Sequence, residues 1–361
     1  MLPLKDPTLL KTQSLIDNQW VDAVDRTTID VTNPFDNQVI ATIPSLEKSQ
    51  VIDAVAIAHK AQIDWAQKTA NERAAILNNW ADLIDQNKED LATIMTAEQG
   101  KPMTESRGEI SYANSLIRWF AEEAKRIYGD IIPSTNKDLR YVVLKQPIGV
   151  CAAITPWNFP AAMITRKVAP ALAAGCSIIV KPAAETPLTA LALGELAVRA
   201  GLPAGLLQIV TGKSSVIGEV LTQDERIHKL SFTGSTEVGR ILMSQCASTV
   251  KKLSMELGGN APFIVFDDAD LEKAASGLIA SKYRNAGQTC VCANRVYVQA
   301  SIKDKFLAIF KQKVEALKVG NGMTEGVNIG PLINQGALDK VEQLLEDAVN
   351  KGATIVTGGK K

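Results

Sequence analysis

The sequence predicts an α/β fold, a doubly wound parallel sheet joined to a second α/β domain. From Ile148 onward, short apolar and β-branched runs alternate with helical runs, the pattern of strand–helix–strand units. The expected strands are 148–154, 177–181, 206–210, 227–232 and 250–255, with helices beginning near Pro160, Pro187, Ser214 and Ser235. Ligands in such sheets bind beyond the carboxyl ends of the strands, so the segments after these strands are candidate sites.

The residues before this alternation form two further regions. Residues 20–45 alternate as in short strands, and Asn33-Pro34 is a turn signal. Between 47 and about 129, apolar residues recur three or four positions apart, which predicts helices. Residues 139–145 are expected to form one strand flanked by turns. After 256 we expect strands 262–266, 295–299 and 354–356, with helices near 270–283, 303–317 and 337–350.

Length and composition limit the classes of function. A chain of 361 residues exceeds what one core usually supports, so two domains are expected. Lys plus Arg and Asp plus Glu balance at 39 each, which gives no indication of nucleic acid or an anionic membrane as partner. No signal peptide or membrane-spanning run is recognisable, so a cytoplasmic protein is expected. Five cysteines without framework spacing suit a reducing compartment, and with two histidines no metal site is expected.

Three stretches contain the residue types that acyl-enzyme chemistry requires. A thiol follows a small-residue turn in Gly287-Gln288-Thr289-Cys290. An amide side chain lies in Pro156-Trp157-Asn158-Phe159-Pro160, and a carboxylate in Glu256-Leu257-Gly258-Gly259. These types serve as nucleophile, oxyanion donor and general base. Taken alone, Cys290 is as typical of a small packed hydrophobe.

Together the three stretches resemble the signature of the aldehyde dehydrogenase superfamily, and the resemblance covers nearly the whole chain. It implies that Cys290 attacks the aldehyde carbon to give a thiohemiacetal. The oxyanion then lies between the Asn158 amide and the Cys290 backbone N–H. Hydride transfer to a nicotinamide leaves a thioester, which water activated by Glu256 hydrolyses.

The resemblance also implies a nicotinamide dinucleotide at the strand ends. The candidate cofactor-binding residues are Thr155, Pro156, Trp157, Lys181, Ala183, Ala184, Gly234, Ser235 and Leu257. Bare backbone and a hydroxyl at a helix start suit a phosphate at Gly234-Ser235, although an ordinary N-cap fits this motif equally well. Ala184 is small and neutral where NAD-preferring members often have Glu, which favours NADP and leaves NAD acceptable.

Segments 145–150, 162–167 and 284–292 resemble the succinate-semialdehyde dehydrogenases within this superfamily. Arg166 and Arg284 match the guanidinium groups that hold the substrate's distal carboxylate there, a task that suits the planar fork of Arg. Either Arg taken alone is more typical of an ion pair on a helix surface. The alternatives are a dehydrogenase for glutarate semialdehyde or another aldehyde, and an inactive truncated paralogue that only binds nucleotide or partners.

The resemblance divides the chain and adds a redox prediction. It assigns 1–127 and 148–257 to a dinucleotide-binding domain, 128–147 to an oligomerisation hairpin and 258–361 to the catalytic domain, and it implies a homodimer or homotetramer. The family pattern continues past Lys361, so we expect a fragment with a truncated catalytic domain and little or no activity alone. Cys292 is expected to pair reversibly with Cys290 under peroxide, although a small packed residue is as good an interpretation.

Overall fold

The computed structural model describes residues 2–360, which divide into two compact units. Unit 1 comprises the described residues of Met1–Val31, Val39–Ile94 and Arg107–Leu257, and unit 2 those of Thr32–Gln38, Met95–Ser106 and Gly258–Lys361. The last division falls between Leu257 and Gly258. Thr32–Gln38 and Met95–Ser106 group with the later part of the chain by their contacts, and the expected domain assignment stays a prediction.

Unit 1 is built on a seven-stranded sheet with the order β11-β10-β7-β8-β9-β1-β2. Five strands are parallel and lie close to the predicted ranges, which confirms the doubly wound sheet: β7 (Val150–Ile154), β8 (Ser177–Lys181), β9 (Leu207–Ile209), β10 (Ile227–Thr233) and β11 (Lys252–Glu256). Two antiparallel strands that the sequence did not place here extend the sheet beyond β9. They are β1 (Ser14–Ile16) and β2 (Gln19–Val21).

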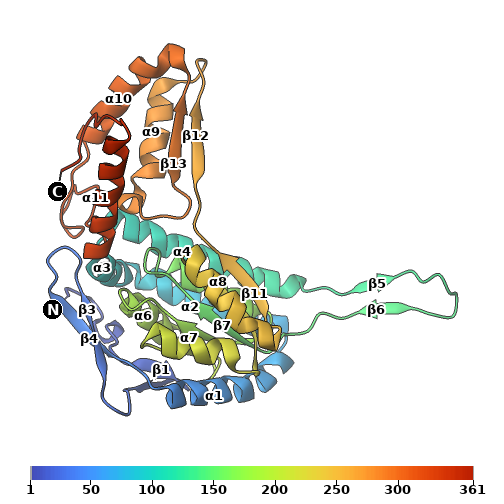
Figure 1. The fold of residues 1–361 in the computed structure, drawn as a ribbon. Coiled ribbons are helices and arrows are strands. Elements are labelled where there is room, and N and C mark those ends of the chain that lie inside the picture. The colour runs from blue at the N-terminus through green and yellow to red at the C-terminus, as the bar shows by residue number, and fades with distance from the viewer. Residues whose placement is uncertain (1, 361) are drawn as a thin grey trace. The chain divides into compact units, whose positions relative to one another are not determined.

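Helices cover both faces of this sheet (Figure 1). One face packs against α1 (Lys48–Gln67), α7 (Ser214–Gln223) and α8 (Thr236–Cys246), and the other against α5 (Ala162–Ala173) and α6 (Pro187–Arg199). Helix α2 (Ala70–Gln86) packs on α5 and α6 in turn. Leu230 and Phe232 of β10 lie in the core on the α1, α7 and α8 side of the sheet, together with Val55 and Leu221. Each such buried side chain contributes roughly 1.5–3 kcal/mol of transfer free energy.

The edge strand β11 alternates between these two faces. Leu253 and Met255 pack on the core between the sheet and helices α1, α7 and α8, whereas Ser254 and Glu256 point to the side of α5. This is the period-two alternation of a pleated strand. It places Glu256 opposite α5.

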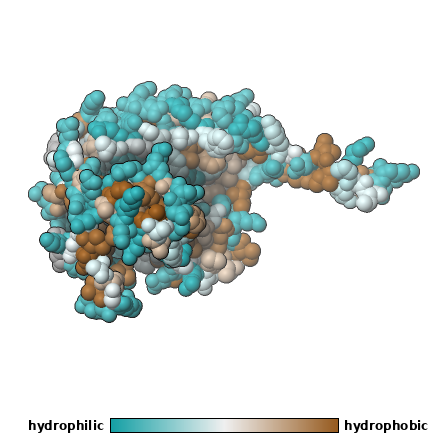
Figure 2. All heavy atoms as spheres, turned by 90° about the horizontal axis from the view of Figure 1, so that it is seen from above, coloured by the Kyte–Doolittle hydropathy of each residue, from teal (hydrophilic) through white to brown (hydrophobic). Residues whose placement is uncertain are grey.

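A two-stranded hairpin within the expected 128–147 extends from the rest of unit 1 (Figure 1). Strands β5 (Asp130–Ile132) and β6 (Tyr141–Val143) pair antiparallel, where the sequence predicted a single longer strand. In Figure 2 apolar side chains lie along the hairpin and its tip is hydrophilic. Ile131 is 78% and Val142 63% exposed. Exposed apolar surface of this kind marks an interaction site, and its role in oligomerisation stays a prediction.

Unit 2 has a smaller sheet of its own. Strands β12 (Ala261–Val265) and β13 (Ala293–Val298) pair in parallel, and α9 (Leu271–Lys282) and α10 (Lys303–Glu315) pack with them around Leu278 and Phe306. Helix α11 (Gln335–Asn350) follows. The strand predicted at 354–356 is wrong: this segment is irregular, because no strand among residues 2–360 supplies its ladder.

The remaining elements connect these parts. Helices α3 (Lys88–Gln99) and α4 (Met103–Glu123) each contain residues of both units, and β3 (Thr28–Thr32) pairs with β4 (Val39–Pro44). Short 3-10 segments occur at Pro7–Leu9, Ala124–Arg126, Ala247–Thr249, Arg284–Gly287 and Ala300–Ile302. No helix of residues 2–360 is long and apolar enough to span a bilayer.

Candidate active site

The candidate residues of unit 1 gather at one edge of the sheet. The register pairs Ile154 with Lys181 and with Phe232, and it pairs Thr233 with Glu256. Since these strands are parallel, the segments that follow them emerge at the same edge. Thr155–Asn158, Lys181–Ala184, Gly234-Ser235 and Glu256-Leu257 all lie there.

Lys181 forms a buried corner of this edge. Its Nζ donates to the Ser214 hydroxyl at 2.8 Å, at the start of α7, and its carbonyl accepts from Thr155 N at 3.1 Å. Burial lowers the pKa of Lys181, and the charge of Glu185 opposes that effect. The Thr155 hydroxyl is buried without a partner among the described residues. Ala184, like Glu185, is half-buried. The sequence did not single out Ser214, because a Ser at a helix start is commonplace.

The start of α8 is shaped by glycine. Gly234 N donates to Glu256 O at 3.1 Å, and a Cβ atom there would collide with the Phe232 ring. The Ser235 hydroxyl accepts from Val238 N at 3.2 Å, so this side chain is the N-cap of α8. Helix N-termini present unpaired N–H groups that favour phosphate. With the unpartnered Thr155 hydroxyl and the Lys181 ammonium, this edge fits a dinucleotide.

Leu257 and Ala183 pack around this site. A Cβ atom at Gly239 of α8 would lie 2.6 Å from a Leu257 methyl, so the glycine makes room for that side chain. Ala183 is buried, and its carbonyl accepts from Thr186 N at 3.3 Å. The small residues therefore let the backbone approach closely at the strand ends.

The loop that carries Asn158 is fixed by a carboxylate from α4. Ala161 N and Ala162 N donate to one oxygen of Glu109 at 2.9 and 3.2 Å, and Glu109 is buried. A carboxylate suits the N-terminal end of α5. On the other side, the Thr186 hydroxyl donates to Trp157 O at 3.5 Å. Sequence reasoning missed Glu109, since nothing distinguishes it from the exposed acids of α4.

Arg166 of α5 is positioned by Tyr112 of α4. Its Nη2 donates to the Tyr112 hydroxyl at 2.6 Å, and its guanidinium carbon lies 5.9 Å from the centre of that ring. The Nε of Arg166 is buried without a partner among residues 2–360. One edge of the guanidinium is thus held by the protein while Nε remains to bind an acceptor. Tyr112 was also missed by the sequence.

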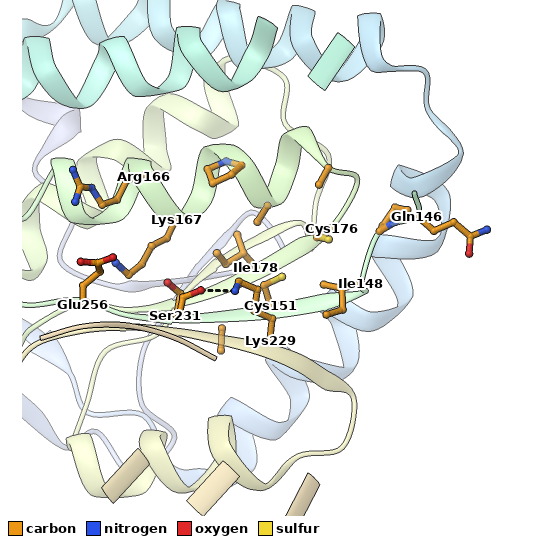
Figure 3. A pocket seen from close by; sticks show the side chains of 16 residues that line it. Gln146, Ile148, Cys151, Arg166, Lys167, Cys176, Ile178, Lys229, Ser231 and Glu256 are labelled. Atoms are coloured by element: carbon orange, nitrogen blue, oxygen red, sulfur yellow. Dashed lines mark hydrogen bonds between the residues drawn. The ribbon is translucent and has the colours of Figure 1, made fainter. Parts of the chain in front are cut away.

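Glu256 lines a cavity of about 470 Å³ with Arg166 and Lys167. Figure 3 shows these three side chains at one end of the cavity. Lys167 is buried and its Nζ donates to the Thr233 hydroxyl at 2.5 Å. Burial lowers the pKa of Lys167 to about 8, the charge of Arg166 adds to that effect and the charge of Glu256 opposes it. Lys167 was not predicted as a site residue, because a Lys in a helical run is usually solvated.

Cys290 of unit 2 is exposed on a tightly held loop. The preceding residues Asn285 and Ala286 are left-handed, with φ of 52° and 53°. Asn285 N donates to the Glu105 carboxylate at 2.8 Å, and its side-chain oxygen accepts from Gln99 at 2.9 Å. Such strain persists only where the surroundings fix it. The loop is therefore held rigidly for the thiol.

Two neighbours of Cys290 complete this loop. A Cβ atom at Gly259 would lie 2.6 Å from Cys290 O, so only glycine allows this approach. Cys292 is buried, and its thiol lies 3.3 Å from Thr289 O and 3.4 Å from Gly287 O. The Cys292 thiol thus donates to carbonyls of its own loop, and its pairing with Cys290 stays a prediction.

The predicted residues are organised in two sets. Asn158, Glu256 and Arg166 lie in unit 1, whereas Cys290 and the exposed Arg284 lie in unit 2. Within residues 2–360, no group of three or more metal-binding side chains occurs. Each set has its own hydrogen-bonded support, and together they contain the nucleophile, amide and carboxylate of acyl-enzyme chemistry.

A strand edge that fits a dinucleotide and an exposed thiol on a supported loop are both features of dehydrogenases that work through a thiol. The chain belongs to the aldehyde dehydrogenase family, which it matches over residues 20–361. It is 56% identical to the succinate-semialdehyde dehydrogenase [NADP(+)] GabD of Escherichia coli strain K12, over 99% of this chain and 74% of that protein.

Two further relatives extend the comparison. The glutarate-semialdehyde dehydrogenase of Pseudomonas putida strain KT2440 is 57% identical over 99% of this chain and 75% of its own. The crystal structure of an aldehyde dehydrogenase from Brucella melitensis biovar abortus 2308 superposes with a TM-score of 0.99, at 63% identity over 100% of this chain and 75% of that chain. The predicted family and fold are confirmed.

Lys167→Met should change how stability depends on pH. Between the folded pKa of about 8 and the ordinary value of 10.5, the unfolded Lys binds a proton that the folded one lacks. Wild-type unfolding free energy should therefore rise across this range relative to the variant, by up to about 3 kcal/mol. Urea titrations of both proteins at several pH values measure the difference. Parallel curves from pH 7 to 10 would contradict it.

Proposed function

We propose that this protein oxidises succinate semialdehyde to succinate with NADP, NAD being an acceptable substitute. The observation that carries the proposal is the Arg166 guanidinium, which lines the same cavity as Glu256 and has an unpartnered buried Nε. A carboxylate on the far end of a short aldehyde would satisfy that donor. The name of the Escherichia coli relative supports this substrate and cofactor, and that of the Pseudomonas putida relative supports glutarate semialdehyde as the second candidate.

The residues of this chain divide the chemistry between them. The Cys290 thiolate attacks the aldehyde carbon, forming a C–S bond, and the carbonyl oxygen becomes an oxyanion. The Asn158 amide and the Cys290 backbone N–H would donate to that oxygen, contributing about 3–4 kcal/mol each to lowering the barrier. Conversion of this adduct to a thioester breaks the C–H bond of the former aldehyde carbon, and a bound nicotinamide dinucleotide would supply the acceptor for that hydride. Glu256 takes a proton from a water molecule while the oxygen of that water attacks the thioester carbon, and the C–S bond breaks.

Substrate selection rests on the two Arg residues. Arg166 is half-buried and oriented by Tyr112, so little conformational entropy is lost when it binds an anion. Arg284 begins the supported loop that ends at Cys290, and it is exposed. In this proposal both guanidiniums meet the distal carboxylate of the semialdehyde.

The cofactor proposal rests on the strand-end groups. Lys181 and Ser214 would receive the adenosine ribose, and the N-terminus of α8 at Ser235 the pyrophosphate. Thr155, Pro156, Trp157 and Leu257 are proposed to line the remainder. Ala184 leaves room and adds no negative charge beside Lys181, which favours the 2′-phosphate of NADP. Glu185 acts against that preference.

Assembly and location complete the proposal. The exposed apolar side chains of the hairpin β5–β6 support a homodimer or homotetramer. A cytoplasmic location stays a prediction.

Replacing the nucleophile tests the chemistry. In the full-length protein, Cys290→Ala should abolish NADPH formation while leaving the Kd for NADP nearly unchanged, because only the attacking atom is lost. Cys292→Ala is the matched control and should keep most of its turnover. Initial rates and cofactor titrations decide this. Substantial turnover in Cys290→Ala would end the proposal.

Replacing the Arg residues tests the substrate. Arg166→Ala and Arg284→Ala should each raise KM for succinate semialdehyde by about ten- to a hundredfold, since a charge-assisted hydrogen bond contributes about 1.5–3 kcal/mol. Tyr112→Phe keeps the ring but loses the 2.6 Å bond to Arg166, so its effect should be smaller and in the same direction. The KM for butanal, which lacks the carboxylate, should hardly change in these variants. Equal losses for both aldehydes would show that the Arg residues are structural.

Adding a carboxylate tests the cofactor preference. Ala184→Glu should shift the ratio of kcat/KM values towards NAD, because a carboxylate accepts from the ribose 2′-hydroxyl and repels a 2′-phosphate. Ala184→Gln is similar in size without the charge and should shift the ratio less. Steady-state kinetics with both cofactors measure it. An unchanged ratio in Ala184→Glu would remove Ala184 from the cofactor site.

A further inference from the structure

The cavity beside α5 has a charged end and an apolar end. Arg166, Lys167 and Glu256 lie at one end of its volume of about 470 Å³, and Figure 3 shows Ile148 at the opposite end. A four-carbon semialdehyde would fill only part of this space. Apolar side chains line much of the remainder: Pro147, Ile148, Pro170, Ala171, Ala174 and Ile178. A pocket of this size, largely apolar with a few polar groups, is typical of small-molecule sites.

The charged end has donors that no acceptor of the protein satisfies. The Nε of Arg166 is buried without a partner among residues 2–360, while Nη2 of the same group donates to the Tyr112 hydroxyl at 2.6 Å. Lys167 is 6% exposed, and its Nζ donates to the Thr233 hydroxyl at 2.5 Å. Neither cation forms a salt bridge with Glu256 or with any other carboxylate of the described residues. Since buried charges are normally paired and buried donors bonded, this end suits an anionic acceptor.

The charge balance favours an anion with a single negative charge. The two cations of the charged end face one carboxylate, that of Glu256, so one positive charge remains. A third cation, Lys229, lies further along the cavity, and its Nζ donates to the Ser254 hydroxyl at 2.6 Å. The Lys229 stem can pack against an apolar ligand while its ammonium stays on that hydroxyl. A carboxylate suits the free donor of Arg166, because the two form a charge-assisted hydrogen bond.

The apolar end is shaped for an aliphatic chain. Ala171 and Ala174 are three positions apart, so they lie on the same side of α5, and their small side chains leave the space open. Ile178 of β8 and Ile148, which precedes β7, line the cavity from the sheet. Ile178 is buried, whereas Ile148 is 37% exposed, so the end at Ile148 reaches the surface. An aliphatic chain that lies here leaves water, which is favourable in proportion to the apolar area buried.

We propose that the cavity binds a medium-chain aliphatic carboxylate, with the carboxylate on Arg166 and the chain along the apolar end. Neither inorganic phosphate nor a small carboxylate such as acetate would use both ends. This ligand is additional to the semialdehyde, and its binding involves no reaction. Binding therefore does not rest on the proposed function, whereas competition with succinate semialdehyde for Arg166 does.

Calorimetric titration of the full-length protein at pH 7 with butanoate, hexanoate and octanoate tests the site. The Kd should fall about fourfold with each added CH₂ group, because each group buries further apolar surface in the cavity. The series changes only the length of the chain and keeps the carboxylate constant. It therefore measures the apolar end separately from the charged end.

Two variants separate the ends from the side of the protein. Arg166→Met should raise the Kd of butanoate and of octanoate by a similar factor, about ten- to a hundredfold, because the charge-assisted bond is lost. The Kd of octan-1-ol, which has no charge, should hardly change in this variant. Ile148→Ser should raise the Kd of octanoate about threefold or more and leave that of butanoate unchanged. Ile52→Ser is the matched control, because Ile52 of α1 is 38% exposed and does not line the cavity.

Three results would overturn the proposal. The first is a wild-type Kd that is the same from butanoate to octanoate, which would show an anion site without a site for the chain. The second is an Arg166→Met protein that binds octanoate as tightly as wild type. The third is equal affinity for octanoate in Ile148→Ser and Ile52→Ser. The chain-length series uses the unmodified protein, so it decides even if the variants fold poorly. None of these results bears on the oxidation of succinate semialdehyde, which NADPH formation measures separately.

Discussion

The register between β10 and β11 is the constraint on which the rest of unit 1 depends. Thr233 pairs with Glu256, which puts Glu256 on the face of α5 while Met255 faces the opposite core. A slip of one residue would exchange these faces, burying the carboxylate in an apolar core and exposing Met255. The same pairing brings Thr233 to Lys167, and the turn after β10 begins α8. One ladder therefore positions the carboxylate and the helix N-terminus together.

Helix α4 is the second support, acting through α5. Glu109 fixes the N-terminal end of α5, after the Asn158 loop, and Tyr112 holds Arg166 one turn further along. The two α4 residues are three apart and so share a face. Unit 2 uses the same strategy, with Gln99 and Glu105 holding the left-handed turn before Cys290.

Much of this was predictable from periodicity and motif, and the remainder depended on tertiary contacts. The parallel strands were predicted because buried β runs alternating with helices give a strong local pattern. The antiparallel β1 and β2 were not placed in the sheet, since Ser14–Ile16 is too short to signal a partner. Cys290, Glu256 and Asn158 stood out through their motifs. The roles of Glu109, Tyr112 and Lys167 follow only from the residues that they contact in the folded protein. The expected strand at 354–356 failed because a strand needs a partner that its own residues do not reveal.

The central claim is that Cys290 forms a thioester, which is hydrolysed by water that Glu256 activates. Trapping this covalent intermediate tests the claim most directly. Glu256→Gln, mixed with succinate semialdehyde and NADP and quenched in acid, should carry a succinyl group on the peptide that contains Cys290, formed together with one equivalent of NADPH. The quenched wild type should carry much less, because its thioester is hydrolysed. A Glu256→Gln protein that makes NADPH without any acyl group on Cys290 would contradict this account.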